Sequence, residues 1–186
     1  PNLYLLATRQ KNNVERALND LTAWASKQNQ QDNPGVIFGV ATAHLLLKQT
    51  QRAKNQLKRV IKAPWSLEDG EYLERCWLLL SDIYIQAGQN KMDVAAELLR
   101  RVLTYNKSCA KAYEYLGYIA EKEQSYREVA TQFENAWRIT NQRNPTVGYR
   151  LALSYLKSKQ FTDAIDISQA VLQRYPDHLK LRKDVL

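Results

Sequence analysis

Acid–base or metal chemistry in this chain would depend on very few side chains. Its 186 residues include two histidines, His44 and His178, and two cysteines, Cys76 and Cys109. A general base needs a partner within hydrogen-bond reach, and a structural zinc site needs ligand pairs at short spacing. Neither histidine stands in a motif with a nucleophile or a carboxylate, and the cysteines lack CxxC spacing. The sequence therefore predicts no enzyme, no metal, no cofactor and no small-molecule substrate, and leaves open only a site assembled from distant segments.

The composition indicates a folded protein from a reducing compartment. Hydrophobic residues make up 45 % of the chain, and six glycines and five prolines form no flexible tract. The two cysteines give no disulfide framework. The chain begins without Met and shows neither a signal segment nor an apolar run long enough to cross a bilayer. We expect one continuous, soluble, cytoplasmic body that is an excerpt of a longer protein and has no direct membrane insertion.

Basic residues give the chain a net charge of +8, and they are densest in one short segment. Apolar residues recur between these cations at helical spacing, which is typical of an amphipathic helix with a charged outer face. Such a face is either simply solvated or attracts an acidic partner. Nucleic acid is not expected, because binding a single strand needs exposed stacking aromatics, and most aromatics here occupy core positions. The basic patch consists of Arg52, Lys54, Lys58, Arg59 and Lys62.

The elements that carry these residues are repeated helical hairpins. A tetratricopeptide repeat begins with an aromatic residue, followed by a leucine beside a small residue and then by another large residue. Trp77–Tyr84 follows this order with a serine as the small residue, and Tyr113–Ala120 follows it with a glycine there but has Ala120 in place of the last large residue. Successive small residues lie 40, 36 and 35 positions apart, close to the repeat length of about 34. These small residues are Ala41, Ser81, Gly117 and Ala152.

This period predicts an all-α fold, a tetratricopeptide-repeat solenoid, which is a right-handed superhelix of antiparallel helix pairs. The small residue should lie where the two helices of a hairpin cross. Asn33-Pro34 and Asn144-Pro145 each mark a helix start, because proline suits the first helical turn. Ser66 and Asp69 resemble a capping box that opens the next helix. We expect one array over residues 1–186, with repeats at 1–30 (partial, its first helix at 3–8), 34–64, 69–108, 110–143 and 145–176, and a capping helix starting in 177–186.

The first helix of each hairpin should carry the binding surface. In such solenoids these helices line the concave side, where a fixed set of positions faces a partner. Many of these positions are apolar here, and exposed apolar patches mark contacts. The side chains therefore either bind a partner protein or pack against an adjoining repeat, and we expect Tyr118, Tyr149 and Leu153 to lie near one another. The expected binding residues are Phe38, Leu78, Asp82, Tyr118, Glu121, Tyr149, Leu153 and Leu156.

Several segments outside the repeat consensus also match one family. The chain resembles the C-terminal repeats of tetratricopeptide repeat protein 21, a ciliary subunit of intraflagellar transport complex A. The resemblance covers residues 54–186, and the first fifty residues add little to it. The matching segments are KNQLKRV (54–60), WLLLSDIYIQAG (77–88), AYEYLGYIAEKEQSY (112–126), NPTVGYRLALSYLKSKQFTDAIDI (144–167) and LRKDVL (181–186).

The resemblance implies a role that composition and periodicity do not reach. It implies a non-catalytic scaffold at the cilium and the ciliary base that binds other protein subunits of complex A and acts in retrograde transport. No catalytic residues of the family can be carried over. The alternative is a generic adaptor of the same fold that binds a short peptide motif in its concave groove.

Overall fold

A computed structural model describes residues 6–185, apart from the side chain of Gln89. Within these residues the chain is helical and contains no strand, as the repeat period predicts. Residues 3–5 of the helix expected over residues 3–8, and the chain end at Leu186, lie outside the described residues. The elements are α2 (Lys11–Lys27), α3 (Pro34–Leu46), α4 (Thr50–Lys58), α5 (Gly70–Ala87), η1 (Gln89–Lys91), α6 (Met92–Tyr105), α7 (Ala110–Lys122), α8 (Tyr126–Ile139), α9 (Pro145–Lys157), α10 (Phe161–Arg174) and α11 (Leu179–Asp184).

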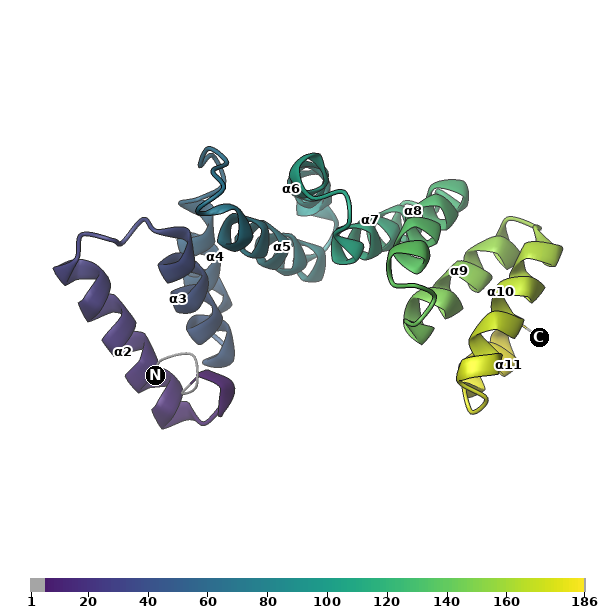
Figure 1. The fold of residues 1–186 in the computed structure, drawn as a ribbon, viewed down its shortest axis with the longest axis horizontal. Helices are drawn as coiled ribbons and strands as arrows, with labels where there is room; N and C mark the ends of the chain where they lie inside the picture. Colours follow the sequence, from purple (N-terminus) through teal and green to yellow (C-terminus); the bar gives the residue numbers. More distant parts are fainter. Residues whose placement is uncertain (1–5, 186) are drawn as a thin grey trace. The chain divides into compact units, whose positions relative to one another are not determined.

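The chain forms two compact units that meet in sequence between Leu98 and Leu99, inside α6. We call them the N-terminal unit and the C-terminal unit. In the N-terminal unit α3 packs against α2, α4 and α5, and α4 also contacts α5 (Figure 1). Trp77 of α5 is fully buried, and its indole Nε1 donates a hydrogen bond to the carbonyl oxygen of Val60 at 3.1 Å. This ring therefore joins the end of the α3–α4 hairpin to the next helix.

The small residue of α5 lies at a helix crossing. Ser81 is fully buried, and its Oγ donates to the carbonyl oxygens of Trp77 at 2.8 Å and of Ala95 at 3.4 Å. The second carbonyl belongs to α6, so the side chain bridges the two helices of the hairpin. A larger residue would push them apart, because a packed interior has no spare volume.

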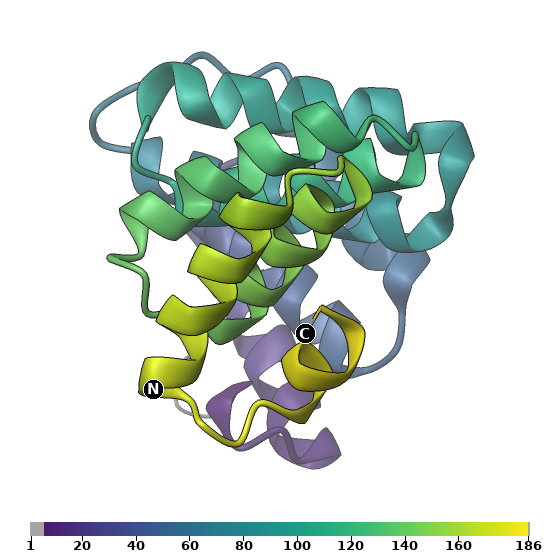
Figure 2. The same ribbon diagram turned by 90° about the vertical axis from the view of Figure 1, so that its right-hand side faces the viewer.

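In the C-terminal unit, α8 packs against α7 and α9, and α9 also contacts α10 and α11; successive helices follow one another through short turns in both ribbon views (Figures 1 and 2). The small residue of α7 again sits at a crossing. A Cβ added to Gly117 would lie 2.9 Å from ring carbons of Phe133 in α8, closer than real Cβ contacts allow. Glycine is needed here because the Phe133 ring, itself fully buried, takes the space.

A second glycine, Gly148 of α9, leaves space for the ring of Trp137, which belongs to the preceding hairpin. The repeat pattern has an aromatic residue at this position, and this chain has none there. A Cβ on Gly148 would lie 2.7 Å from a ring carbon of Trp137 and 2.4 Å from a methyl carbon of Val171. Trp137 of α8 thus fills the space that the missing aromatic leaves, and Val171 of α10 closes it from the other side.

Asparagine side chains begin two helices, at the two Asn-Pro pairs. Asn33 Oδ1 accepts hydrogen bonds from the backbone N–H groups of Gly35 and Val36, at 2.9 and 3.3 Å. Asn144 does the same for α9. The expected capping box is displaced: Ser66 Oγ accepts from the Asp69 backbone N–H at 3.1 Å, but this turn precedes α5, which begins at Gly70.

Candidate protein-binding surface

The histidines and cysteines make local packing and hydrogen-bond contacts. Burial raises the pKa of the Cys76 thiol to about 12, and its Sγ lies 3.5 Å from the carbonyl oxygen of Pro34. Cys109 is buried at the residue preceding α7. His44 is buried beside Gln49, with 2.9 Å between Nδ1 and the amide oxygen. His178 Nδ1 accepts from the backbone N–H of Leu181 and caps α11. Each side chain thus has a structural contact.

Neither a metal-binding group nor a membrane-spanning helix is found among the described residues. No group of three or more His, Cys, Asp or Glu side chains among them is arranged to hold a metal ion. None of their helices is long and apolar enough to span a membrane.

Phe38 of α3 lines a groove of about 280 Å³ in the N-terminal unit. The other walls come from α2 and α5, with Leu21 on one side and Tyr72 on the other. The Arg75 guanidinium carbon lies 5.9 Å from the centre of the Phe38 ring and 5.6 Å from that of Tyr72, within range of cation–π attraction. Glu71 pairs with the same guanidinium. The groove therefore has aromatic walls, and its cation, Arg75, already has a carboxylate partner in Glu71.

Leu78 and Asp82 occupy α5, one turn apart. Both side chains are half-buried. Asp82 accepts a hydrogen bond from Gln86 Nε2 at 3.0 Å, a contact within its own helix. Because α5 packs on α3, the three expected residues of the N-terminal unit lie on neighbouring helices.

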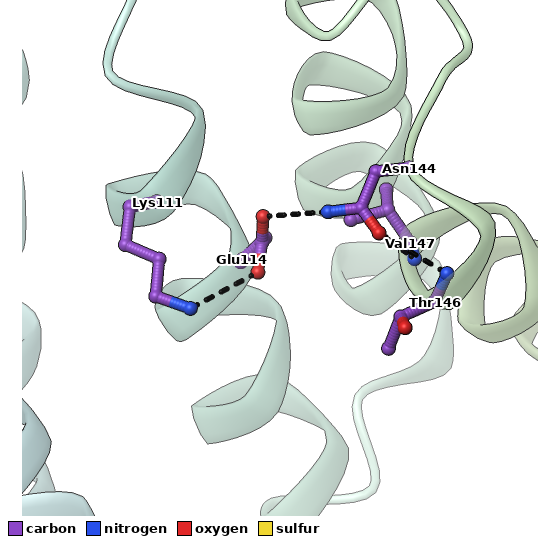
Figure 3. A network of polar contacts seen from close by, with 5 residues as sticks. All are labelled: Lys111, Glu114, Asn144, Thr146 and Val147. Atoms are coloured by element: carbon purple, nitrogen blue, oxygen red, sulfur yellow. Dashed lines mark hydrogen bonds and ion pairs between the residues drawn. The ribbon is translucent and has the colours of Figure 1, made fainter.

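In the C-terminal unit a polar network joins the starts of α7 and α9 (Figure 3). Glu114 of α7 is 8 % exposed and accepts from Lys111 Nζ at 3.4 Å and from Asn144 Nδ2 at 3.2 Å. The other side-chain atom of Asn144, Oδ1, accepts from the backbone N–H groups of Thr146 and Val147 at 3.1 and 3.3 Å. One amide thus begins α9 and ties it to the preceding hairpin through a buried carboxylate.

A second link joins the C-terminal part of α7 to the middle of α9. The Arg150 guanidinium forms an ion pair with Glu121, and its carbon lies 4.4 Å from the centre of the Tyr118 ring. Tyr118 meets Phe133 edge-on, with ring centres 5.6 Å apart. Both Tyr118 and Glu121, expected to face a partner, are thus contacted by Arg150 of the following hairpin.

A third link joins α9 to α11. Tyr149 donates its hydroxyl proton to Asp184 Oδ2 at 2.7 Å, and its ring centre lies 5.6 Å from that of His178. The hydrogen bond to Asp184, with a smaller effect of burial, raises the tyrosine pKa above its usual value. Leu181 of α11 is fully buried in the core of the C-terminal unit. The short last helix is therefore held by an apolar anchor and a polar link.

Leu153 and Leu156 complete the expected set on α9. Both are half-buried. Leu153 lines a small depression with Glu121, Tyr126 and Arg150, so it borders the second link between α7 and α9. Tyr118 and Tyr149 both pack against the core of the C-terminal unit.

Sequence reasoning missed one residue in each of these three links. They are Asn144, which donates to Glu114, Arg150, which pairs with Glu121, and Asp184, which accepts from Tyr149. Each contact spans about one repeat, 29 to 35 residues in sequence. A comparison of charged residues about one repeat apart would have found the Glu121–Arg150 pair. The two residues have opposite charges and lie on α7 and α9, the first helices of successive hairpins.

The basic patch lies on α4 and the turn after it. Arg52, Lys58, Arg59 and Lys62 are exposed, and Lys54 is half-buried. The helix covers its inner side with the buried residues Ala53 and Leu57. Arg52 and Lys58 therefore lie on the outer side of an amphipathic helix, as the sequence predicts, whereas Arg59 and Lys62 lie in the turn that follows it.

Comparison with known proteins now decides the family. The model of the tetratricopeptide repeat protein 21 C-terminal ARM domain matches residues 1–186. The chain belongs to this family. It is 52 % identical to mouse tetratricopeptide repeat protein 21B over 185 residues, 51 % identical to the human protein of that name, and 42 % identical to the *Caenorhabditis elegans* homolog over 187 residues. All of this chain is covered in each case, and it spans 14 % of each relative's length.

Solved structures place this family member in the tetratricopeptide-repeat fold. MamA matches with a TM-score of 0.73 at 14 % identity, over 94 % of this chain and 95 % of that one. YrrB, described as a tetratricopeptide-repeat protein with an unusual peptide-binding site, matches with a TM-score of 0.69 at 17 % identity, over 92 % and 83 %. At this identity the likeness concerns the fold alone. Family and fold together support a repeat-based protein-interaction scaffold, and they point to a non-catalytic role.

Proposed function

We propose that this chain is a protein-binding part of a subunit of intraflagellar transport complex A. In this role it binds other subunits of the complex, works in retrograde transport, and resides in the cilium and at the ciliary base. The observation that carries the proposal is the match of the whole chain to the C-terminal domain of the tetratricopeptide repeat protein 21 family. The transport role itself comes from the family resemblance of the sequence.

The arrangement of the C-terminal unit fits a structural subunit. Three polar links hold α7, α9 and α11 in fixed register, at Glu114–Asn144, Glu121–Arg150 and Tyr149–Asp184. A surface held in register suits a permanent assembly, which commonly buries a broad area. Leu153 borders the Glu121–Arg150 link, and Leu156 lies three residues further along α9; both are half-buried, and we propose them as contact residues.

The second candidate function is a peptide adaptor. It is favoured by the groove beside Phe38, which has aromatic walls and a volume of about 280 Å³. YrrB, of similar fold, is described as having a peptide-binding site. A motif binder concentrates its binding energy in a few groove residues. The two functions therefore differ in which unit of the chain binds the partner. A scaffold would hold several subunits through the C-terminal unit, whereas an adaptor would hold one motif-bearing protein through the N-terminal unit.

A chimera tests the proposal. The chain replaces the matching 185 residues of mouse tetratricopeptide repeat protein 21B in mouse ciliated cells that lack the native protein, and subunits that co-purify are quantified by mass spectrometry. Leu153→Asp with Leu156→Asp should reduce recovery of the complex A subunits as a group and slow retrograde movement in live imaging. A carboxylate buried at a contact is strongly unfavourable.

The matched control carries the same change on α10. Phe161 and Ile165 are 57 % and 43 % exposed, one turn apart. Phe161→Asp with Ile165→Asp should leave subunit recovery unchanged, while circular dichroism checks that both double variants stay helical. Full recovery with the α9 variant would refute the proposed contact. Loss of a single associated protein after Phe38→Ala, with the complex intact, would favour the adaptor.

A further inference from the structure

Charge in the N-terminal unit is sharply segregated along the chain. Residues 33–67, which include α3 and α4, contain six Lys and Arg and no Asp or Glu. The flanking segments of the same unit carry its acidic residues, from Glu15 to Asp32 and from Glu68 to Glu97. A field of one sign over a surface attracts the opposite charge in solution and raises association rates.

Most cations of the basic patch have no internal counter-charge. The side chains of Lys54, Lys58 and Lys62 make no hydrogen bond or ion pair with any residue that the structure describes. Within the described residues, the Arg52 guanidinium donates only to the neutral side-chain oxygen of Gln49, at 3.2 Å. These side chains have no charged partner through which they could stabilise the fold. Pairing within the fold therefore does not explain why they are concentrated on α4 and the turn after it.

The chain itself shows how a carboxylate binds at this surface. Asp32, in the turn between α2 and α3, pairs with Arg59, and 85 % of the Asp32 side chain is exposed. Arg59 also donates to Gln56 Oε1 at 3.0 Å. Because the pair is largely solvated, it holds weakly, and an incoming carboxylate can replace Asp32.

An apolar pocket opens at the same arginine. It has a volume of about 130 Å³ and lies among α2, α3 and α4. Its floor is formed by Ala25, Val36 and Val40, and its rim includes Ser26, Gln56 and Arg59. The pocket is therefore small, mostly apolar at its base, and bordered by a cation of the basic patch.

We propose that the basic patch and this pocket together bind an acidic protein segment with one aliphatic anchor side chain. The anchor enters the pocket, and the flanking carboxylates meet Arg59, Lys58 and Lys62. The pocket decides in favour of protein over the other polyanions, because a bilayer surface or a phosphate backbone offers no isolated aliphatic side chain between its charges. The surface is separate from the residues proposed on α9, and it does not depend on the transport-complex assignment.

The test uses the 186-residue chain and a fluorescein-labelled glutamate-rich peptide with one central leucine. A second peptide has alanine in place of that leucine. Fluorescence anisotropy measures both affinities at rising salt. The leucine peptide should bind about tenfold more tightly than the alanine peptide, since one buried aliphatic side chain contributes roughly that factor. Both affinities should fall with salt, because exposed charges are screened.

Two variants separate charge from pocket. Lys58→Gln with Arg59→Gln and Lys62→Gln should weaken both peptides by about tenfold, the combined effect of three exposed ion pairs. Ser26→Leu fills the pocket from its exposed rim and should abolish the preference for leucine while leaving the alanine peptide unchanged. The matched control is Lys107→Gln with Lys122→Gln and Lys180→Gln, three exposed cations of the C-terminal unit whose loss removes the same charge.

Clear results would overturn the proposal. Equal losses in the patch variant and the control variant would show that net charge alone acts. Equal binding of the two peptides by the unaltered chain would remove the pocket from the account. Tighter binding to phosphatidylserine vesicles or to double-stranded DNA than to the leucine peptide, lost in the patch variant, would assign the patch to a membrane or to nucleic acid instead.

Discussion

The C-terminal unit uses two arginines to join neighbouring repeats, whereas the N-terminal unit leaves a group of cations exposed on one short segment. Arg150 pairs with Glu121 and stacks on Tyr118, and Arg174 donates to the backbone carbonyls of Asn141 and Gln142. On α4 and the turn after it, by contrast, the side chains of Lys58 and Lys62 have no hydrogen-bond or ion-pair partner within the described chain. The same residue types therefore join repeats in one unit and form an open charged surface in the other. Net charge by itself would not have distinguished these two uses.

The largest expected effect concerns helix approach in the C-terminal unit. Gly148→Ala should lower the free energy of unfolding by about 3 kcal/mol, because the new Cβ would meet the buried Trp137 and Val171. Gly39→Ala in the N-terminal unit should have little effect. Its Cβ would meet only the Leu21 methyl at 3.2 Å, which can rotate away, and alanine favours the helix. Urea denaturation measures both, and similar losses would show that the units are equally tight.

The next effect compares the two Asn-Pro caps. Asn33→Ala should reduce stability by about 1 kcal/mol through loss of the cap alone. Asn144→Ala should reduce it by about 2 kcal/mol, since buried Glu114 also loses a hydrogen bond. Asn→Asp sharpens the contrast. At position 33 it keeps the cap, but at position 144 it puts a second carboxylate beside Glu114. Equal effects of the two Asp variants in thermal melts would contradict the link to Glu114.

A smaller effect concerns the docking of α11. Tyr149→Phe removes the hydrogen bond to Asp184 and should lower stability by about 1 kcal/mol near neutral pH. The tyrosine pKa is raised in the folded chain, so its stabilising contribution is complete below the unfolded pKa of about 10 and is lost as pH rises through the higher folded value. The difference in unfolding free energy between parent and variant should therefore shrink at alkaline pH. A constant difference would show that the hydroxyl does not act through its proton.

The smallest effect is expected on α4. Lys54→Gln with Lys58→Gln and Lys62→Gln should change the free energy of unfolding by less than about 0.5 kcal/mol, because none of these lysines has an internal partner. Differential scanning calorimetry checks this. A large loss of stability would mean that the cations serve the fold, and it would remove the contrast between the two units.

Local patterns predicted the elements better than the contacts between them. The 3.6-residue period predicted the helices, and Asn33-Pro34 and Asn144-Pro145 marked two starts correctly, because capping depends on residues close in sequence. Gly117 and Ser81 were correctly expected at helix crossings. At Gly148 the repeat pattern shows only that the usual aromatic residue is missing, since nothing close in sequence shows that Trp137 supplies the ring.

The candidate surface was the harder part to predict. The expected concave residues were chosen by repeat position, which indicates the side of the helix but not the neighbour. Tyr149 illustrates the limit, because its partner Asp184 lies 35 residues away on a short helix that departs from the repeat. The pocket beside Arg59 could not be predicted either, since it forms only where three helices meet.

Cross-linking mass spectrometry of complex A assembled with the chimeric subunit tests the central claim most directly. Lys157 lies on α9, which carries the proposed contact residues, and Lys111 lies on α7, which polar links join to α9; both lysines supply reactive amines. The account predicts cross-links from these lysines to other subunits of the complex, and their loss with Leu153→Asp and Leu156→Asp. Cross-links confined to the subunit itself, or inter-subunit cross-links that persist unchanged in the double variant, would contradict it.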